Sequence, residues 1–465
     1  MNAPIQHERS DTYVRDIMRE VDDGVGAGWV PARIFGNERV YKEELRRIFG
    51  RCWLYLGHVS EIPNPGDFML RKMGEDDYIV TRDKDGKIHA MLNACRHRGV
   101  HVCRVDRGNA EQFRCLYHGW TFANNGDLVG GPLWKNAYGD MSKSENGLLH
   151  VAQLDTHQGL IFATLDAKAP SLKEYLGGMA WYLDLIFGLN EHGVEFMGPP
   201  QRCVIPGDWK SAADNSCGDD YHLPTLHKSI AEVNAFPVSF VENMKGYHIQ
   251  AAPGHSLSFS SAMTEDDPGP RFFGSPQNLV DSFNTSQISA DQLHAARMSR
   301  VIVGNVFPNF TFIIVPTTDD PSQPPVAGIS LKVWQPKGPD RMEIWNQFPV
   351  YKNMTQEQKE RQYAVTLASF SVGGLFEMDD SEPWSMIHQT GGSVSAEVLD
   401  LKLNYRMGLP DTGIAQRLTD FPGPGVVYAP RYEEGVQRNL YKFYADMMSA
   451  PLDQWPETSF PSDEL

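Results

Sequence analysis

The sequence lacks any segment that could cross a membrane or direct export. No apolar run approaches the roughly 20 residues that a membrane-spanning helix needs. The N-terminal stretch MNAPIQHERSDTYVRDIMREVDD is charged and has none of the apolar core of a secretory signal peptide. We therefore expect a cytoplasmic protein without a membrane partner.

Positive charge is also in short supply. The chain has 42 lysines and arginines against 59 aspartates and glutamates, which gives a formal net charge of −17 at pH 7. Such a surface repels polyanions at long range. We therefore expect no nucleic-acid partner.

Cysteine is too rare to build a fold held together by disulfides. Only six occur in 465 residues, and in a reducing compartment such thiols stay free to bind metal. The sequence also lacks a glycine fingerprint for nucleotides between a strand and a helix, so NADH or flavin would have to be bound by a partner protein. Four of the cysteines are expected to be plain buried thiols: Cys52, Cys103, Cys203 and Cys217.

The composition is that of an ordinary globular protein, with 41% hydrophobic and 22% charged residues. The length predicts at least two domains. Residues 1–45 are predicted to form a helical segment that packs against the third segment, residues 46–165 a small domain of short β runs, and residues 166–465 a larger mixed domain.

Local signals support this division. Asp85-Gly86 and Asn125-Gly126 each separate two short alternating stretches, which predicts two hairpins in the small domain. In the larger domain the strands and helices are segregated along the chain, which favours an α+β fold. Residues 355–380 are predicted to form one long helix that begins with a capping box of Thr355 and Gln358.

Two Cys/His pairs stand in the small domain. Cys95 and His97 are separated by one residue, and Cys115 and His118 by two, with seventeen residues between His97 and Cys115. These ligand types admit a structural zinc or an iron–sulfur cluster. The single residue between Cys95 and His97 is unusual for zinc, whereas a two-iron cluster with two Cys on one iron and two His on the other needs two such loops.

A second group of polar residues lies in the stretch DNSCGDDYHLPTLH, residues 214–227. Two imidazoles and a distant carboxylate would form the facial triad of a non-heme iron site. His222 and His227 point about 140° apart on a regular helix at about 100° per residue. Pro224 lies between them, and a helix broken there could aim both rings at one ion.

Together these motifs resemble the large (alpha) subunit of Rieske non-heme iron aromatic-ring-hydroxylating oxygenases. The resemblance rests on C-x-H, C-x-x-H-G-W and N-x-x-x-D-x-x-H-x-x-x-x-H, and it spans most of the chain. It implies a small all-β Rieske [2Fe-2S] domain, and a larger catalytic domain in which helices cover an antiparallel sheet in a helix-grip arrangement. The implied metal ligands are Cys95, His97, Cys115 and His118 for the cluster, and His222, His227 and Asp380 for a mononuclear Fe(II).

The family resemblance also suggests roles for neighbouring residues. Asp380 lies in LFEMDDSEPW, where Asp379 is the alternative iron ligand. Asn215 and Asp219 are expected to be catalytic, with Asp219 joining His118 of a neighbouring chain to His222 in a homotrimer. Lys210 and Lys228 flank the motif and could anchor a carboxylate, but we interpret them as solvated surface lysines. The expected substrate-binding residues are mostly neutral or apolar: Ser216, Cys217, Leu223, Leu226, Phe310, Phe370 and Phe376.

The implied function is that of a terminal oxygenase. It would use O2, and electrons from a separate ferredoxin or reductase, to hydroxylate a small neutral aromatic substrate, with ring dihydroxylation favoured. The alternative is an N- or O-dealkylating Rieske monooxygenase acting on an alkyl-substituted aromatic compound. The alternatives from another class are a Rieske electron carrier and a zinc-stabilised binding protein, neither with oxygenase chemistry. Whether a small beta subunit accompanies the trimer is left open.

Overall fold

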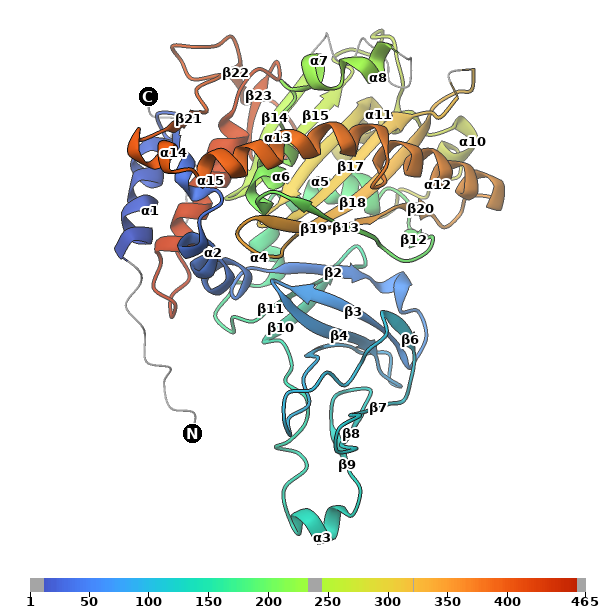
Figure 1. The fold of residues 1–465 in the computed structure, drawn as a ribbon. Helices are drawn as coiled ribbons and strands as arrows, with labels where there is room; N and C mark the ends of the chain where they lie inside the picture. The colour runs from blue at the N-terminus through green and yellow to red at the C-terminus, as the bar shows by residue number, and fades with distance from the viewer. Residues whose placement is uncertain (1–11, 233–244, 321, 458–465) are drawn as a thin grey trace.

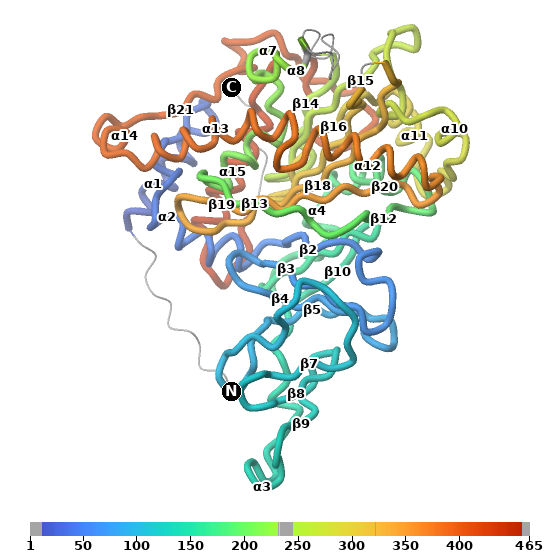
Figure 2. The backbone as a smooth tube through the Cα atoms, turned by 45° about the vertical axis from the view of Figure 1, so that its right-hand side comes forward, coloured from blue at the N-terminus to red at the C-terminus, as the bar shows by residue number. Residues whose placement is uncertain are grey.

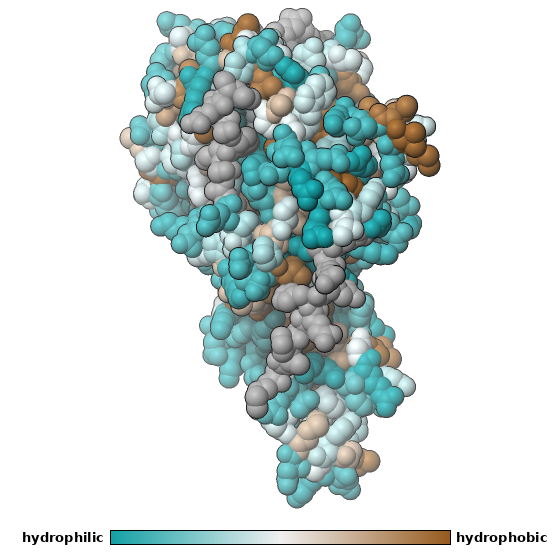
Figure 3. Space-filling model, turned by 90° about the vertical axis from the view of Figure 1, so that its left-hand side faces the viewer, coloured by the Kyte–Doolittle hydropathy of each residue, from teal (hydrophilic) through white to brown (hydrophobic). Residues whose placement is uncertain are grey.

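The computed structural model describes residues 12–232, 245–320 and 322–457. Figure 1 shows a broad upper part, here called the body, and a narrower lower part that ends at α3 (Trp134–Tyr138), here called the tip. The space-filling view of one face shows the same outline and a mostly hydrophilic surface (Figure 3). Among the described residues, no helix combines the length and apolar character needed to span a bilayer.

The centre of the body is an antiparallel sheet, nine-stranded in the described part of the chain. Its central strands are buried along most of their length, so side chains on both faces pack against other elements. Its strands, in spatial order, are β13 (Gln201–Pro206), β19 (Arg341–Gln347), β18 (Val326–Pro336), β17 (Phe310–Thr317), β16 (Ser299–Val306), β15 (His255–Ser261), β14 (Gly246–Ala252), β23 (Val426–Ala429) and β22 (Gln416–Leu418).

Helices cover this sheet. The long helices α12 (Gln356–Phe370) and α13 (Leu375–Gly391) run across its front in Figure 1, and α12 packs on β18. The helix α6 (Trp209–Ser216) contacts β16, β17 and β18, and α15 (Gly435–Ser449) packs on β14 and β15. The expected α+β class, with helices over an antiparallel sheet, is thus confirmed.

The predicted single helix over residues 355–380 is wrong, because it is two helices. The capping box is present, since the Thr355 side chain accepts from the backbone of Gln358 and Gln358 caps in return. The first helix ends at Phe370 and the second begins at Leu375. A Cβ at Gly374 would lie 2.6 Å from the carbonyl carbon and oxygen of Ser369, so the tight turn requires glycine there.

Shorter elements complete the body. The segment α1 (Thr12–Val25) packs along α15, and β1 (Trp29–Pro31) pairs with β21 (Lys402–Asn404), so the N-terminal segment lies against the body. The remaining elements of the body are α2 (Glu38–Glu44), α4 (Leu172–Leu176), α5 (Met179–Phe187), β12 (Val194–Phe196), α7 (Leu223–Leu226), α8 (Lys228–Glu232), α10 (Gln277–Val280), α11 (Ala290–Met298), β20 (Pro349–Tyr351) and α14 (Val394–Val398), with the short turns η1 (Ala32–Ile34), η2 (Leu45–Phe49) and η4 (Phe272–Gly274).

The tip and its base are built from short antiparallel strands (Figure 2). Both predicted hairpins are confirmed, since β4 pairs with β5 around Gly86 and β8 pairs with β9 around Gly126. The elements are β2 (Leu54–His58), η3 (Val59–Glu61), β3 (Asp67–Met73), β4 (Asp76–Arg82), β5 (Ile88–Leu92), β6 (Arg107–Asn109), β7 (Gln112–Arg114), β8 (Thr121–Ala123), β9 (Leu128–Gly130), β10 (Gln153–His157) and β11 (Leu160–Thr164).

The two parts have separate hydrophobic cores. The strands β2 and β11 contribute Leu54, Tyr55 and Phe162 to the large core of the body. The outer strands of the tip enclose a small core of their own that contains Cys95 and Cys115. The tip is therefore anchored to the body through its base, while its far end is held by local packing.

Candidate metal centres and substrate pocket

The two Cys/His pairs lie on two loops of the tip that close in the same way. In the first loop, which follows β5, the backbone amide of Gly99 donates to the carbonyl of Cys95 at 2.8 Å. In the second, between β7 and β8, the amide of Gly119 donates to the carbonyl of Cys115 at 3.0 Å. Both glycines have positive φ, 75° and 70°, so each tight loop needs a glycine four residues after its cysteine.

The four side chains converge. The rings of His97 and His118 have centroids 4.4 Å apart, and His97 stacks on Trp120 at 5.1 Å. Cys95 and Cys115 are both buried, and burial together with Cys115 raises the pKa of the Cys95 thiol. Within the described residues, Nδ1 of His97 is buried without a hydrogen-bond partner. Two thiols on one side and two imidazoles on the other fit a Rieske cluster, which would leave the exposed His118 on the outside.

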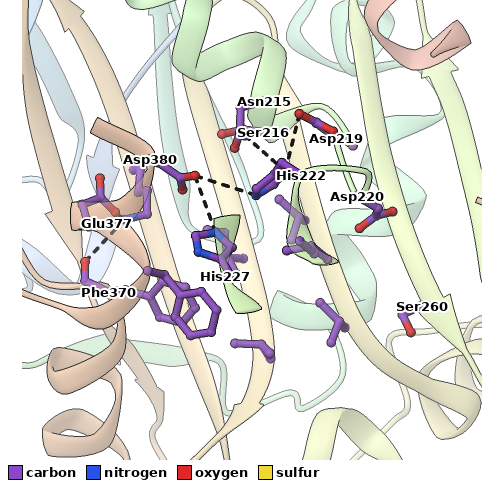
Figure 4. Close-up of a pocket in the computed structure, with 18 of the residues that line it drawn as sticks. Asn215, Ser216, Asp219, Asp220, His222, His227, Ser260, Phe370, Glu377 and Asp380 are labelled. Atoms are coloured by element: carbon purple, nitrogen blue, oxygen red, sulfur yellow. Dashed lines mark hydrogen bonds and ion pairs between the residues drawn. The ribbon is translucent and has the colours of Figure 1, made fainter. Parts of the chain in front are cut away.

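A second convergence lies in the body. One ligand atom each from His222, His227 and Asp380 lies within 4.8 Å of the others. Oδ1 of Asp380 is 3.7 Å from Nε2 of His222 and 3.5 Å from Nε2 of His227 (Figure 4). The two histidines come from one short segment, and Asp380 lies more than 150 residues later in the sequence.

Local structure explains how the two histidines reach one point. The predicted break in the helix is present: α6 ends at Ser216, and His222 and His227 flank the one-turn helix α7. Pro224 lies in the first turn of α7, where its missing N–H breaks no hydrogen bond. The chain therefore turns between the two rings instead of continuing as a straight helix.

The electrostatics of the three side chains fit a metal site. Burial raises the pKa of Asp380 to about 7. Burial alone would lower the pKa of His222, but Asp219 and Asp380 raise it to about 9, whereas burial and the neighbouring His222 lower that of His227 to about 4. Oδ1 of Asp380 is buried and has no hydrogen-bond partner among the described residues. Two imidazoles and one carboxylate are the donor set of non-heme Fe(II) oxygenases, and a cation would satisfy this oxygen.

Other polar groups hold the outer nitrogens of the two rings. Oδ2 of Asp219 lies 3.4 Å from Nδ1 of His222, and Nδ2 of Asn215 lies 3.5 Å from the same atom. Oδ2 of Asp379 lies 3.2 Å from Nδ1 of His227. The structure thus brings Asp380 to the converging nitrogens and Asp379 to an outer one, an arrangement that orients metal-binding imidazoles.

A pocket opens beside these ligands. Of the expected substrate-binding residues, Ser216, Leu223, Phe370 and Phe376 line it. Phe370 and Phe376 stack on each other at 5.1 Å, and Phe376 meets the ring of His227 edge-on at 5.1 Å. These two rings form an aromatic wall next to the ligands.

Three expected pocket residues do not line it. Phe310 stacks on Tyr55 at 4.2 Å in the core, because side chains alternate along β17 and it is residues 313 and 315 that face the pocket. Cys217 is fully buried behind α6, where its thiol donates to the carbonyl of Asp214 at 3.0 Å. Leu226 is half-buried outside the lining.

Sequence reasoning missed most of the remaining wall. Which face of β16 and β17 meets the pocket is decided by tertiary packing, which a local sequence pattern does not record. The missed lining residues include apolar side chains of these strands, two tryptophans and several polar groups: Val301, Val303, Ile313, Val315, Trp334, Trp384, Lys332, Glu377, Asp220, Ser260 and Arg431.

The structure corrects the interpretation of Lys210. It is fully buried, and its Nζ lies 2.6 Å from Glu44 and 2.7 Å from Asp208, so it is part of an internal ion cluster. Lys228 is exposed, as expected, and lies 3.6 Å from Glu232. Of the other cysteines, Cys52 and Cys103 are buried, while Cys203 is only half-buried.

Comparisons with known proteins agree with this geometry. Residues 52–151 match the Rieske [2Fe-2S] domain, and residues 172–450 match the ring hydroxylating alpha subunit (catalytic domain). Both ranges fall inside the segments predicted as residues 46–165 and 166–465, whose boundaries remain a prediction.

Individual relatives cover nearly the whole chain. It is 36% identical to the N,N-dimethyl phenylurea N-demethylase subunit alpha of Sphingobium sp. (strain YBL2), over 96% of this chain and 97% of that protein. It is 35% identical to the biphenyl 2,3-dioxygenase subunit alpha of Rhodococcus jostii (strain RHA1), over 94% and 92%. A crystal structure of naphthalene 1,2-dioxygenase from Rhodococcus sp. bound to indole is similar with a TM-score of 0.89 and 37% identity, over 94% of this chain and 99% of that one. The chain therefore belongs to the ring-hydroxylating oxygenase alpha subunits, oxidoreductases that combine a Rieske [2Fe-2S] domain with a catalytic domain for mononuclear iron.

Proposed function

We propose that this chain dihydroxylates the ring of a neutral aromatic compound, as the terminal oxygenase of a multicomponent system. The observation that carries the proposal is the convergence of His222, His227 and Asp380 on a pocket with a largely apolar wall. Since the chain belongs to an oxygenase family, the bare electron carrier and the zinc-stabilised binding protein are set aside.

The ligand roles follow from the two convergences. Cys95, Cys115, His97 and His118 would hold the [2Fe-2S] cluster, and His222, His227 and Asp380 would hold Fe(II). When bound, these groups supply single electrons and the activation of O2. Asp219 and Asp379 accept hydrogen bonds from the outer nitrogens and so fix the tautomer and the aim of the two imidazoles.

The pocket positions the substrate. Phe370 and Phe376 offer a flat aromatic wall beside His227, and the apolar side chains of β16 and β17 that pack with this wall exclude water. A ring held against this wall stays next to the iron ligands in one orientation, which is the main catalytic contribution that such a wall can make.

Electrons are proposed to pass between chains in a homotrimer. Within one chain, the loop between β7 and β8 lies in the tip and α7 lies at the opposite end of the body (Figures 1 and 2). The His118 ring is exposed, and the Asp219 side chain is 35% exposed, so both are available to a second copy. Asp219 would accept a hydrogen bond from His118 of that copy while it holds His222.

Further partners follow from the chemistry. A ferredoxin or reductase would deliver electrons to the cluster, because the sequence has no nucleotide-binding fingerprint of its own. The relatives are named alpha subunits, which supports a small beta subunit as an additional partner.

A second candidate function is N-demethylation. It is supported by the 36% identity to an N-demethylase alpha subunit across almost the whole of both chains. The same ligand set would serve, with an N-methyl carbon instead of a ring edge placed beside His222 and His227.

A turnover experiment under 18O2 separates the two. The purified oxygenase with a surrogate ferredoxin and reductase is given biphenyl, naphthalene and 1,1-dimethyl-3-phenylurea, and products are read by mass spectrometry. Two labelled oxygens in one ring product support the proposal. Formaldehyde with a demethylated product, and no labelled ring, would replace it by the second candidate.

A further inference from the structure

One end of the pocket is polar. Arg431, which follows β23, and Ser260, on β15, line the same pocket as His222, His227 and Asp380. Figure 4 shows Asp220 and Ser260 on the far side of His222 from Asp380. The described residues thus give this pocket an aromatic wall at the iron ligands and hydrogen-bonding groups away from them.

Two of the three guanidinium nitrogens of Arg431, Nη1 and Nε, have partners in the protein. Its Nη1 lies 2.7 Å from Oδ2 of Asp220 and donates to the Ser258 hydroxyl at 2.9 Å, and its Nε donates to the Lys245 carbonyl at 3.2 Å. Within residues 12–232, 245–320 and 322–457, its Nη2 makes no hydrogen bond. Arg431 is 4% exposed and lines the pocket, so this nitrogen is available to a group that enters the pocket.

Ser260 adds a second donor next to it. Residues two positions apart on a strand point to the same face of the sheet and lie about 7 Å apart along the strand. Ser260 therefore lies on the same face of β15 as Ser258. Ser260 is 3% exposed, lines the pocket, and its hydroxyl makes no hydrogen bond in the described part of the chain. Two donors without a protein partner are therefore available to a ligand that accepts hydrogen bonds.

Asp220 offers an acceptor at the same place. Its Oδ2 accepts from Ser258 at 2.5 Å and lies 2.8 Å from Nε2 of His248, while no hydrogen bond engages its Oδ1 among the described residues. The same Oδ2 lies 2.7 Å from Nη1 of Arg431. This ion pair already balances the charge of Arg431, which favours a neutral group over a carboxylate.

We infer that this end of the pocket binds the amide or urea group of an N-aryl substrate. The carbonyl oxygen accepts from Arg431 and the Ser260 hydroxyl, and the N–H donates to Oδ1 of Asp220. The aryl ring then points toward Phe370, Phe376 and the iron ligands, so the ring and not an N-alkyl carbon meets the site of oxidation. The inference rests on the proposed function and names its substrate class.

Binding measurements test it on the resting holoenzyme. Titration calorimetry compares 1,1-dimethyl-3-phenylurea with its thiourea analogue, a much weaker acceptor of similar shape. The wild type should prefer the urea, and Ser260→Ala should reduce that preference about fivefold, the effect of one neutral hydrogen bond. Arg431→Lys keeps the charge beside Asp220 but loses the second donor, and should reduce the preference about tenfold.

A matched variant controls for damage to the strand. Ser261→Ala removes the next hydroxyl of β15, which donates to the carbonyls of Ala262 and Met298 and does not line the pocket, and should leave the preference unchanged. An unchanged urea preference in Ser260→Ala, together with the wild-type melting temperature, would overturn the inference, as would a wild type that binds both compounds equally.

Failure of the proposed function gives a different result. If the preference changes as expected but 18O2 turnover of the urea releases formaldehyde, the polar end is retained and the proposed ring dihydroxylation fails. If the preference does not change while biphenyl is dihydroxylated, the proposed function stands and the polar end is discarded.

Discussion

The two candidate metal centres are built in opposite ways. In the tip, all four side chains come from 24 consecutive residues, Cys95 to His118, and each pair lies in a short loop closed by its own backbone. In the body, two ligands flank α7 and the third comes from α13, more than 150 residues later. The site in the tip is therefore formed by residues close together in the sequence, whereas the site in the body depends on how α13 packs against the sheet.

The surroundings differ as much as the connectivity. The tip encloses an apolar core that includes the two ligand thiols, and its ligand histidines lie near the surface. The body buries ionisable groups such as Lys210, Glu44 and Asp214 together with its site. A substitution in the tip should therefore disturb mainly its neighbouring residues, whereas a substitution near the site of the body should disturb more distant residues as well.

The largest expected effect comes from removing one ligand in each region. Asp380→Ala should lower turnover by more than about 100-fold, beyond the 10–100-fold typical of outer hydrogen-bond partners, and should retain acid-labile sulfide. Cys115→Ser should lower turnover similarly but lose the sulfide and the visible spectrum of the cluster. Iron and sulfide analysis checks both. Asp379→Asn is the matched control, and if it lost as much activity as Asp380→Ala, the ligand assignment would be wrong.

Mixed oligomers test whether the two regions work across chains. Asp380→Ala chains and Cys115→Ser chains, each inactive alone, are coexpressed with different tags and purified through both. If electrons pass from the tip of one chain to the body of its neighbour, the mixture should regain a substantial part of wild-type turnover. Turnover no higher than that of the single variants would contradict the proposed trimer path.

A smaller effect is expected at the proposed junction. Asp219→Asn keeps the shape of the side chain but removes the charge that holds Nδ1 of His222, so both metals should remain while turnover falls about 10–100-fold. The measurement is steady-state turnover with iron and sulfide analysis. Full turnover in this variant would exclude the bridge, and loss of iron would make Asp219 a structural residue instead.

The smallest effect concerns stability. Burial raises the pKa of Asp214 to about 7, although Tyr405 and Tyr441 both donate to its Oδ2, at 2.6 and 2.7 Å. Because the unfolded chain ionises this carboxyl near its usual pKa of about 4, the folded state loses stability as the pH rises from about 4 to about 7, by at most about 4 kcal/mol at about 1.4 kcal/mol per pKa unit.

Asp214→Asn should flatten this pH dependence. Melting temperatures of wild type and variant, compared from pH 5 to pH 8, should diverge at the higher pH, with the variant falling less. A parallel decline of the two would show that Asp214 is ionised in the folded protein. Asp85→Asn, in the tip, is the control, because Asp85 is exposed in the turn of a hairpin.

Much of the fold could be predicted because its signals are local. The hairpins at Gly86 and Gly126, the capping box at Thr355 and the break at Pro224 each depend on a few neighbouring residues, and each is present. The single helix over residues 355–380 failed because helical periodicity continues through Gly373 and Gly374, while the turn depends on how α12 and α13 pack.

The same contrast applies to the site. The sequence by itself determined the Cys/His loops of the tip and the two histidines around α7, because spacing within a short segment fixes which side chains can meet. Only the tertiary structure decided that Asp380 and not Asp379 reaches the two rings, that Phe310 faces the core, and that Arg431 and Ser260 close one end of the pocket. These outcomes depend on which face of a strand or helix meets another element, and that is set by long-range packing that no local pattern records.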